Sequence, residues 1–347
     1  MRFGLIGAGA IGRVRKAALD VTPGCQLTAV FDHDSAAAGA IAGAAEIFPS
    51  AQALFEADCC DAVVISTPPA FHEALAIAAM EKGKHVLVEK PMANTLDACH
   101  RMIEAARRNA RTLAVGFNHR YFDAVQVVRD AVRTGAIGRL SYVKGFAGHG
   151  GLAEFKAPWM YDKDAMGGGA LFDNGIHMID LVRHILGEVT QVYGVARGDI
   201  WKLDRVEDNA FALLQGPDGR VGSLHASWSE WKGYHFYLEA YGDKGMAGAY
   251  YAPMKARLVT MDRPGGAPRI KRNFYPLTAV REKLRGWQST VIRTFQQEFA
   301  DFVRLAMGEA SHGAIATAVD GARAIEIANA VYRASESGTA VPLADTI

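Results

Sequence analysis

Short apolar runs and helical patterns alternate along the first third of the 347-residue chain, and this alternation constrains the fold more than any other feature. Strand-like runs are expected at residues 3–6, 26–31, 62–66, 85–88 and 112–116. Helical patterns separate them at residues 11–19, 35–42, 71–82 and 95–108. Strands that alternate with helices of this length predict a doubly wound parallel sheet of the α/β class.

A glycine-rich loop, Gly7-Ala-Gly9-Ala-Ile-Gly12, follows the first strand and opens the first helix. Gly7 allows a tight turn, Gly9 lets the backbone approach a pyrophosphate, and Gly12 lets the helix pack on the strand. The free N–H groups and the dipole of the helix N-terminus favour phosphate there. We therefore expect Gly7, Gly9, Ala10, Ile11 and Gly12 to bind a dinucleotide, as in a Rossmann fold.

An acidic residue supports this interpretation. Asp32 ends the second strand, close to the spacing at which an acid binds the hydroxyls of the adenosine ribose. A carboxylate at this place repels a 2′-phosphate, so the sequence predicts NAD and makes NADP the less favoured cofactor. The alternative is a tight turn followed by a structural strand-end aspartate.

The pattern changes after Phe117. A helix is expected at 121–134, a strand from about Leu140 and a helix at 176–186; then six strand-like runs follow one another between 191 and 261, and helices near 290–307 and 315–334 end the chain. Successive strands without intervening helices predict a mostly antiparallel open sheet with flanking helices, an α+β domain. We predict a Rossmann dinucleotide-binding domain at 1–118 and a substrate-binding and oligomerisation domain at 119–347, whose final helices can pack back toward the first.

The composition excludes several classes of protein. Half of the residues are apolar, which is enough for a sizeable core, and 38 basic residues nearly balance 37 acidic ones. This balance gives no electrostatic reason to expect nucleic acid or a membrane as a partner. The four cysteines have no CxxC spacing, no leader pattern is seen, and no apolar run reaches the ~20 residues of a membrane helix. We expect a soluble cytoplasmic protein with reduced cysteines.

Polar residues follow two further strands of the predicted parallel sheet. Thr67 and Pro68 come after the strand at 62–66, and Glu89 and Lys90 come after the strand at 85–88. Ligands of a doubly wound sheet bind beyond the carboxyl ends of its strands. We therefore expect Lys90 to project into the cofactor crevice.

Taken together, six segments resemble the glucose-fructose oxidoreductase, inositol dehydrogenase and MocA family. The segments are GAGAIG, AVFDHD, STPPAFH, GKHVLVEKPMA, VGFNHRY and GGGALFDNGIHMID, and DGARAIEIANAVYRASESG resembles the closing helix of the family. Pro69 departs from the pattern, since many relatives carry Asn there. The resemblance implies an NAD(P)-dependent oxidoreductase acting on a CH–OH group of a sugar or cyclitol. It also implies a catalytic set of Lys90, Asp173 and His177, and a cis Lys90–Pro91 bond.

General chemistry suits these three roles. Histidine has an ordinary pKa of ~6.5, so His177 suits a general base near neutral pH. The Lys90 ammonium can stabilise negative charge that develops on the substrate oxygen. Asp173 lies four residues before His177 and either orients the imidazole or holds a substrate hydroxyl. Glu89 is expected to contact the nicotinamide ribose or to fix Lys90.

Four further residues are candidates with a structural alternative each. His72 is expected either near the nicotinamide ribose or as a helix cap. Asn118 and Arg120 follow a strand end and can reach the substrate, or they are an exposed polar pair at a helix start. Trp159 is expected either as a wall against a sugar ring or as part of the core.

Other functions remain open at this stage. Asp173, His177, Asp180 and His184 recur on one helix face, so a metal-dependent hydrolase is an alternative. We predict no metal, because that hypothesis leaves the glycine loop unexplained. A non-catalytic NAD-bound sensor is another alternative, and a sugar lyase or glycosidase that recycles tightly bound NAD is a third.

Two features concern surfaces. An antiparallel sheet with one uncovered face predicts a homodimer or homotetramer. The segment 263–285 carries seven basic residues and is expected to be a solvated loop, a phosphate-binding element or a subunit contact.

Overall fold

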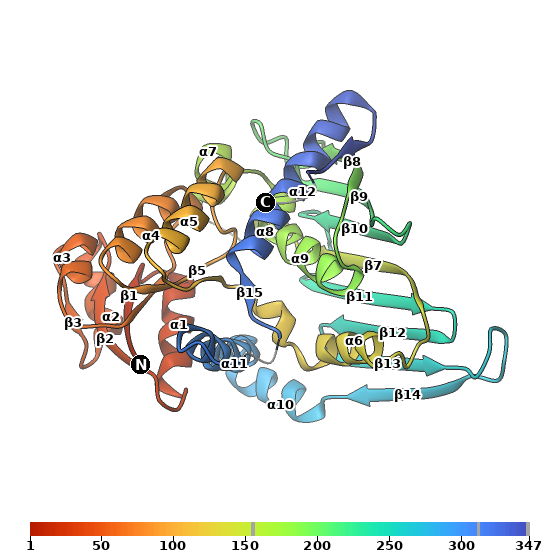
Figure 1. Ribbon diagram of the computed structural model, residues 1–347, viewed down its shortest axis with the longest axis horizontal. Helices are drawn as coiled ribbons and strands as arrows, with labels where there is room; N and C mark the ends of the chain where they lie inside the picture. Colours follow the sequence, from red (N-terminus) through yellow and green to blue (C-terminus); the bar gives the residue numbers. More distant parts are fainter. Residues whose placement is uncertain (154–156, 311–312, 345–347) are drawn as a thin grey trace. The chain divides into compact units, whose positions relative to one another are not determined.

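The computed structural model describes residues 1–153, 157–310 and 313–344, which form two compact units (Figure 1). The first unit contains Met1–Tyr121 and Arg281–Ala322, and the second contains Phe122–Val280 and Arg323–Ile347. The first break lies close to the predicted domain boundary. Residues 281–322, which include one of the final helices, group with the first unit.

The first unit is a doubly wound sheet of seven strands in the order β15-β6-β5-β4-β1-β2-β3. All pairs from β6 to β3 are parallel, as predicted, and only β15 is antiparallel. The strands are β1 (Arg2–Ile6), β2 (Gln26–Phe31), β3 (Glu46–Ile47), β4 (Ala62–Ile65), β5 (His85–Val88), β6 (Leu113–Val115) and β15 (Ala316–Thr317). The helices are α1 (Ala10–Asp20), α2 (Ser35–Ala42), α3 (Ala51–Glu56), α4 (His72–Glu81), α5 (Leu96–Arg108) and α11 (Gln288–Ala306). Short 3-10 turns are η1 (Pro69–Phe71) and η2 (Asn118–Tyr121).

Helix α11 explains why residues far along the chain join the first unit. Phe295, Phe299 and Phe302 of this helix belong to the same buried cluster as Phe3 of β1. The ring of Phe299 meets that of Phe3 edge-on, with centroids 5.4 Å apart. Burying an aromatic side chain of this size stabilises a fold by roughly 1.5–3 kcal/mol, so three of them hold α11 firmly on the first sheet.

The second unit is built on a sheet of nine strands in the order β14-β13-β12-β11-β7-β10-β9-β8-β16. Its pairs are antiparallel except β7 with β10, which confirms the predicted class. The strands are β7 (Leu140–Gly148), β8 (Gln191–Arg197), β9 (Asn209–Gln215), β10 (Val221–Ser227), β11 (His235–Gly242), β12 (Gly245–Tyr251), β13 (Lys255–Thr260), β14 (Arg269–Phe274) and β16 (Val341–Pro342). The helices are α6 (Asp123–Arg133), α7 (Lys163–Met166), α8 (Ala170–Asp173), α9 (Gly175–Leu186), α10 (Pro276–Arg285) and α12 (Ala318–Ser337), with η3 (Gly151–Ala153) and η4 (Pro158–Tyr161).

The basic segment 263–285 is not a loop, so that expectation was wrong. It contains β14, which pairs with β13, and it ends in α10. The side chains of β14 are mostly exposed. Charged side chains on an outer strand discourage pairing with other chains, which explains how a strongly basic sequence can still be a strand.

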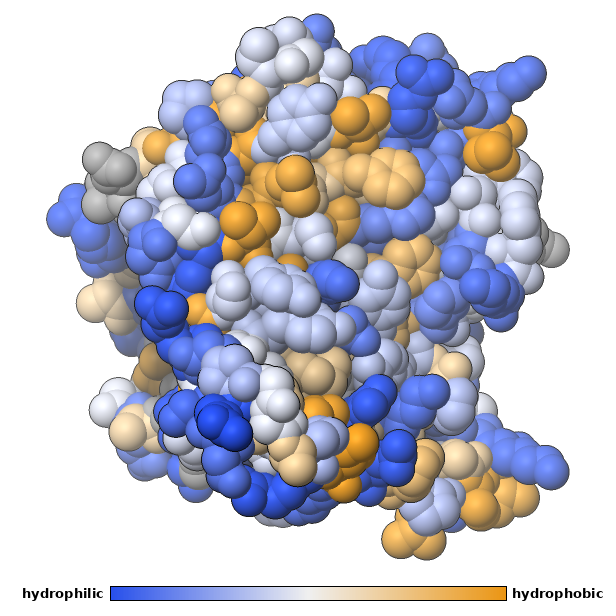
Figure 2. Space-filling view, turned by 90° about the vertical axis from the view of Figure 1, so that its right-hand side faces the viewer, coloured by the Kyte–Doolittle hydropathy of each residue, from blue (hydrophilic) through white to orange (hydrophobic). Residues whose placement is uncertain are grey.

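Small residues let the helices of the second unit lie directly on its sheet. A Cβ at Gly145 of β7 would overlap Met178 of α9, and a Cβ at Gly222 of β10 would lie 2.6 Å from Val182 of the same helix. The opposite side chains of these strands are largely exposed, including Tyr142, Tyr193, Val195, Phe211, Leu213 and Val221. This second face of the sheet therefore presents apolar side chains to solvent. Figure 2 views the side drawn at the right of Figure 1 and shows apolar side chains gathered in patches between polar ones.

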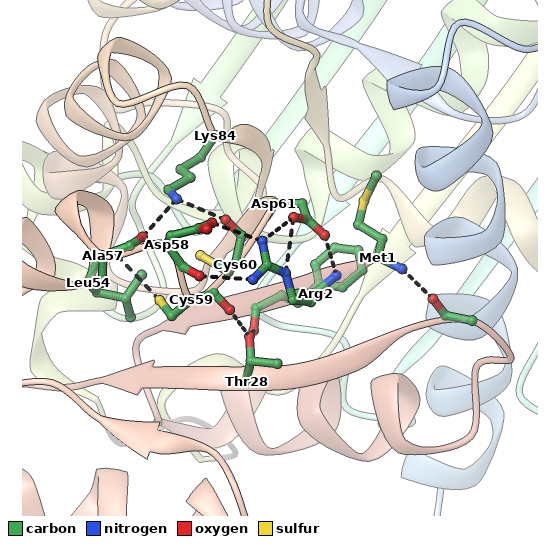
Figure 3. Close-up of polar contacts among 12 residues, drawn as sticks. Met1, Arg2, Thr28, Leu54, Ala57, Asp58, Cys59, Cys60, Asp61 and Lys84 are labelled. Atoms are coloured by element: carbon green, nitrogen blue, oxygen red, sulfur yellow. Dashed lines mark hydrogen bonds and ion pairs between the residues drawn. The ribbon is translucent and has the colours of Figure 1, made fainter.

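Charged side chains tie together the amino ends of the strands of the first sheet (Figure 3). Arg2 at the start of β1 donates to Asp61 before β4, with Nη2 and Oδ1 2.8 Å apart, and to Asp58. The buried Lys84 before β5 donates to the carbonyl oxygens of Ala57 (3.0 Å) and Cys60 (2.9 Å). We call this group of contacts the amino-edge clamp. No described helix is long and apolar enough to cross a bilayer.

Candidate functional site

The three glycines of the loop after β1 have three different surroundings. Gly7 has a positive φ of 95°, and a Cβ there would lie 2.8 Å from the carbonyl of Ser66. A Cβ at Gly12 would overlap the carbonyl oxygen of Gly7, so helix α1 packs directly on the turn. A Cβ at Gly9 would meet no atom within 4 Å. Gly7 and Gly12 are thus required by the fold itself, whereas the fold leaves open space at Gly9.

The N-terminus of α1 fits an anion. Gly9, Ala10 and Ile11 are exposed, no side chain caps the helix at Gly9, and the first turn carries no acidic residue. The first N–H groups of a helix have no partner within it, and the helix dipole makes this end positive. The predicted contacts at Gly9, Ala10 and Ile11 therefore lie where a pyrophosphate can be bound through backbone groups.

Asp32 sits at the end of β2 and is bound to the glycine loop. Its Oδ2 accepts the N–H of Ala8 at 2.6 Å, and its Oδ1 accepts the N–H of Asp34 at 2.9 Å. His33 Nδ1 lies 2.9 Å from Oδ1. Each carboxylate oxygen can accept more than one hydrogen bond, so both oxygens keep capacity for ribose hydroxyls. The sequence did not indicate the second role of Asp32, which is to hold the loop in place.

Two hydroxyl groups after β4 are available to a ligand. The Oγ of Ser66 and the Oγ1 of Thr67 are buried, and neither has a hydrogen-bond partner in the described part of the chain. Buried hydroxyls usually have a partner, so these two point to a group that binds here. Thr67 and Pro68 lie at the carboxyl end of β4, as predicted for cofactor contacts.

His72 connects the loops that follow β4 and β5. Its Nε2 lies 2.8 Å from the carbonyl oxygen of Thr67, and its Nδ1 lies 3.0 Å from that of Pro91. Burial lowers the pKa of the ring, while the two carbonyl oxygens favour the protonated form. Because both ring nitrogens face backbone oxygens, this geometry argues against the predicted contact with the ribose. His72 acts here as a link between two loops.

Lys90 follows β5, and the Lys90–Pro91 bond is cis, which confirms the expectation from the resemblance. The backbone N–H of Lys90 donates to Oε2 of Glu89 at 3.2 Å. Burial, together with the positive charge of Lys90, lowers the pKa of His119 to about 3, so His119 is neutral beside the lysine. Sequence reasoning missed His119, although it follows β6 and so belongs to the same edge of the sheet.

Asn118 and Arg120 are buried, so the alternative of an exposed pair was wrong. Asn118 Nδ2 donates to Oγ1 of Thr294 at 2.9 Å, and Arg120 Nη1 lies 3.4 Å from Oδ2 of Asp320. These bonds join η2 to α11 and to the start of α12. Their predicted contact with a substrate stays a prediction.

In the second unit, Asp173 and His177 are both buried, at the end of α8 and in α9. The N–H of Gly151 donates to Nδ1 of His149 at 3.0 Å, so the ring carries its proton on Nε2. That Nε2 donates to Oδ2 of Asp173 at 2.8 Å, and Trp228 Nε1 donates to the same oxygen at 3.0 Å. Two neutral donors thus hold the Asp173 carboxylate in one orientation.

Aromatic side chains surround this carboxylate. Burial and then the charge of Asp173 raise the pKa of Tyr161 to about 12, and the same two causes raise the pKa of Tyr234. The ring of Tyr161 meets that of Trp228 edge-on, with centroids 5.5 Å apart. His149, Tyr161, Trp228 and Tyr234 were not predicted from the sequence. The ends of the strand-like runs could have indicated His149 and Trp228.

Trp159 lies in η4 with 37% of its surface exposed, so the core alternative for it was wrong. Its predicted contact with a sugar ring stays a prediction. Among the residues that the structure describes, no group of three or more His, Cys, Asp or Glu side chains is arranged to hold a metal ion. The helix face with Asp173 and His177 therefore gives no support to the metal-dependent hydrolase.

Two family models match the chain. The oxidoreductase family model with an NAD-binding Rossmann fold covers residues 1–117, and the GFO/IDH/MocA C-terminal domain covers residues 125–248. Inositol 2-dehydrogenase of Rhizobium meliloti (strain 1021) is 33% identical over 276 residues, which are 76% of this chain and 79% of that protein. Levoglucosan dehydrogenase of Pseudarthrobacter phenanthrenivorans is 30% identical over 191 residues, about half of each chain (48% of both).

A solved structure carries the same fold over the whole chain. The complex of a levoglucosan dehydrogenase with NADH has a TM-score of 0.86 and 22% identity, and the match covers 99% of both chains. The glycine loop, Asp32 and the two hydroxyls after β4 fit a dinucleotide, and the family model adds that this dinucleotide is NAD.

Gly12→Ala should lower the stability of the fold, whereas Gly9→Ala should weaken the binding of NAD. Gly12→Ala forces a Cβ into backbone, and overpacking of this kind costs about 1–3 kcal/mol of unfolding free energy. Gly9→Ala should leave stability unchanged and weaken NAD binding roughly tenfold, about 1.4 kcal/mol, because the pyrophosphate approaches that backbone. Denaturant unfolding and NAD titration check both. If the Gly9→Ala variant binds NAD normally, the pyrophosphate does not bind at this loop.

Asp32→Asn should narrow the preference for NAD over NADP. The amide oxygen can still accept the N–H of Ala8, so the loop is kept while the charge is lost. We expect NAD to bind roughly tenfold more weakly, since a hydrogen bond to a charged group contributes about 1.5–3 kcal/mol. Asp34→Asn is the control, because Asp34 caps α2 from an exposed position. Equal affinity of the unmutated protein for both cofactors contradicts the assignment.

Proposed function

Because this chain belongs to the glucose-fructose oxidoreductase, inositol dehydrogenase and MocA family, we propose that it is an NAD-dependent dehydrogenase that oxidises a secondary hydroxyl of a sugar, sugar derivative or cyclitol. Relatives named inositol 2-dehydrogenase and levoglucosan dehydrogenase support this class of substrate. The proposal rests on the groups that lie at the carboxyl edge of the first sheet. It combines the glycine loop with a lysine, Lys90, held at the end of β5.

Oxidation of a carbinol carbon requires the loss of a hydride and of the hydroxyl proton. NAD, when bound, supplies the acceptor for the hydride. We propose that His177 accepts the hydroxyl proton, because its imidazole suits a general base near neutral pH. Lys90 donates a hydrogen bond to the substrate oxygen and stabilises the negative charge that grows on it as the proton leaves. His119, neutral beside Lys90, adds no second positive charge at this place.

Asp173 is proposed to hold a substrate hydroxyl or the His177 imidazole. His149 and Trp228 both donate to Oδ2, so this oxygen is fixed before any substrate arrives. A carboxylate accepts about four hydrogen bonds, which leaves capacity for a further donor. An acceptor that is already fixed in this way aligns a substrate without a further entropy cost when the reaction occurs.

The aromatic rings near Asp173 suit a carbohydrate. With a pKa of about 12, the hydroxyl of Tyr161 stays protonated at neutral pH and can donate to a sugar oxygen. Rings such as those of Tyr161 and Tyr234 combine an apolar face with a polar tip, which matches the mixed surface of a sugar ring. The exposed Trp159 is proposed as a further wall of this kind.

Replacing Lys90 or His177 tests the mechanism directly. A spectrophotometric screen of NAD reduction over sugars, cyclitols and nucleotide sugars first identifies the substrate. We then expect Lys90→Ala to lower kcat by ~10²–10³-fold, as loss of one electrostatic donor does, with little change in NAD affinity. His177→Ala should lower kcat by ~10²–10⁴-fold. Lys82→Ala, at an exposed position of the same unit, is the control.

Two outcomes would count against this function. Normal turnover by Lys90→Ala would make Lys90 a structural charge and the mechanism wrong. NAD that stays bound through purification while no substrate reduces it would favour a lyase or glycosidase that recycles its cofactor. Steady-state kinetics and the absorbance of bound NADH separate these cases.

We also propose that the chain forms a homodimer or homotetramer through the open face of the second sheet. Apolar side chains face each other across its strands, with Tyr193 beside Leu213 and Val195 beside Phe211. Leu213 is 51% exposed and Phe211 is 48% exposed. A row of exposed apolar neighbours of this kind is typical of a surface that another protein covers.

A charge on that face should separate the subunits. In the double variant Leu213→Glu and Val195→Glu, each replaced apolar side chain loses about 1.5–3 kcal/mol of burial free energy in the interface. The mass measured by light scattering after size exclusion should therefore shift toward that of the monomer. Leu277→Glu in α10 is the control, since Leu277 is also exposed but lies off the sheet. A monomeric unmutated protein, or an unchanged mass in the double variant, contradicts this interface.

A further inference from the structure

A buried ionic cluster joins Glu89 to Arg15 and Glu298, two residues that neither the cofactor contacts nor the proposed chemistry uses. Arg15 of α1 is completely buried; its Nε donates to Oε1 of Glu89 at 2.5 Å, and its Nη1 donates to Oε2 of Glu298 in α11. The guanidinium carbon lies 3.6 Å from the ring centroid of Phe295. We call Arg15, Glu89 and Glu298 the buried triad.

The backbone of the first unit leaves room for this triad. Gly116 follows β6, and a Cβ there would overlap Nη2 of Arg15 and lie 3.2 Å from Oε2 of Glu89. In the described part of the chain, Nη2 of Arg15 and Oε1 of Glu298 have no hydrogen-bond partner. Burying three charged groups costs several kcal/mol for each ion unless they are well paired. A cluster this costly is a weak source of stability, which suggests another role.

The position of Glu89 indicates that role. Its Oε1 is bound to Arg15, and its Oε2 accepts the backbone N–H of the next residue, Lys90, at 3.2 Å. The carboxylate is therefore fixed from one side by the helix of the glycine loop and fixes the lysine on the other. We propose that Arg15 and Glu298 are positioning residues, which hold the Glu89 carboxylate and through it the backbone of Lys90. This inference rests on the proposed function of Lys90.

The charges of the triad support a positioning role. Burial raises the pKa of Glu298 to about 7, Arg15 opposes this, the charge of Glu89 adds to it, and Arg120 of η2 lowers it. The nearby hydroxyl of Tyr121, also of η2, stays neutral, because burial and the charges of Glu298 and Asp301 raise its pKa. Arg15 thus opposes the effect of burial on Glu298 while it is also bound to Glu89.

Arg15→Lys is the decisive variant. Lysine keeps the charge but has no planar fork to bind two carboxylates at once, and it loses the contact with Phe295. Arg13→Lys is the matched control, because Arg13 lies in the same helix and is exposed. We expect Arg15→Lys to lower kcat roughly tenfold, as a small misplacement of a reacting group does, while NAD affinity changes less than about threefold.

Hydrogen exchange tests the inference without any substrate. The Lys90 amide, bound to Glu89, should exchange roughly tenfold faster in Arg15→Lys, in line with the loss of a hydrogen bond to a charged group. The Glu89 amide donates to the carbonyl of Ile65 at 2.9 Å within the sheet and should exchange as before. Exchange of both amides at equally raised rates would mean that Arg15 only stabilises the fold.

Each remaining outcome decides the question. If Arg15→Lys does not fold, Glu298→Ala replaces it, because alanine removes the acceptor of Arg15 Nη1. An unchanged Lys90 amide in that variant overturns the inference. If the unmutated protein oxidises no sugar or cyclitol, the proposed function fails, while the exchange rates still decide whether the triad holds Lys90. Normal exchange and normal kcat in Arg15→Lys reject the positioning role.

Discussion

The first unit depends on one constraint of parallel sheets, which is that neighbouring strands all end at the same edge. Residues that are far apart in the chain, such as Gly9, Asp32 and Lys90, each follow a strand and are therefore brought to that edge. Loops at such an edge can vary in sequence without disturbing the core, because the core is made by the strands and helices beneath them. The groups for binding and the groups for packing are thus separated within a single sheet.

This separation explains which parts could be predicted from the sequence. Gly7 and Gly12 answer a local demand of the backbone, and the acid after β2 stands at a short, regular spacing, so both were visible in one stretch of sequence. The mostly antiparallel sheet of the second unit was equally visible, because its strands follow one another and alternate. Local pattern determines these features, and no long-range contact is needed to recognise them.

Other parts depend on contacts between distant residues and left no local signal. Arg15 and Glu298 are 283 positions apart. A strand end could have indicated Trp228, but not that it binds Asp173, 55 positions away. An exposed pair was one of two alternatives left open for Asn118 and Arg120, because their partners, Thr294 and Asp320, come much later in the chain. Strand β14 was hidden for another reason, since its basic side chains are unusual for a strand and suit only the edge of a sheet.

The amino-edge clamp has a consequence for anyone who wishes to alter this protein. Arg2, Asp61 and Lys84 lie at the opposite ends of the same strands whose carboxyl ends carry the cofactor loops. Enzymes that are made more stable often lose activity when the new contacts stiffen or reshape the active site. Here the two properties are carried by different rims of one sheet. A programme to raise heat tolerance can therefore be confined to the amino rim, while substrate scope is diversified independently at the other.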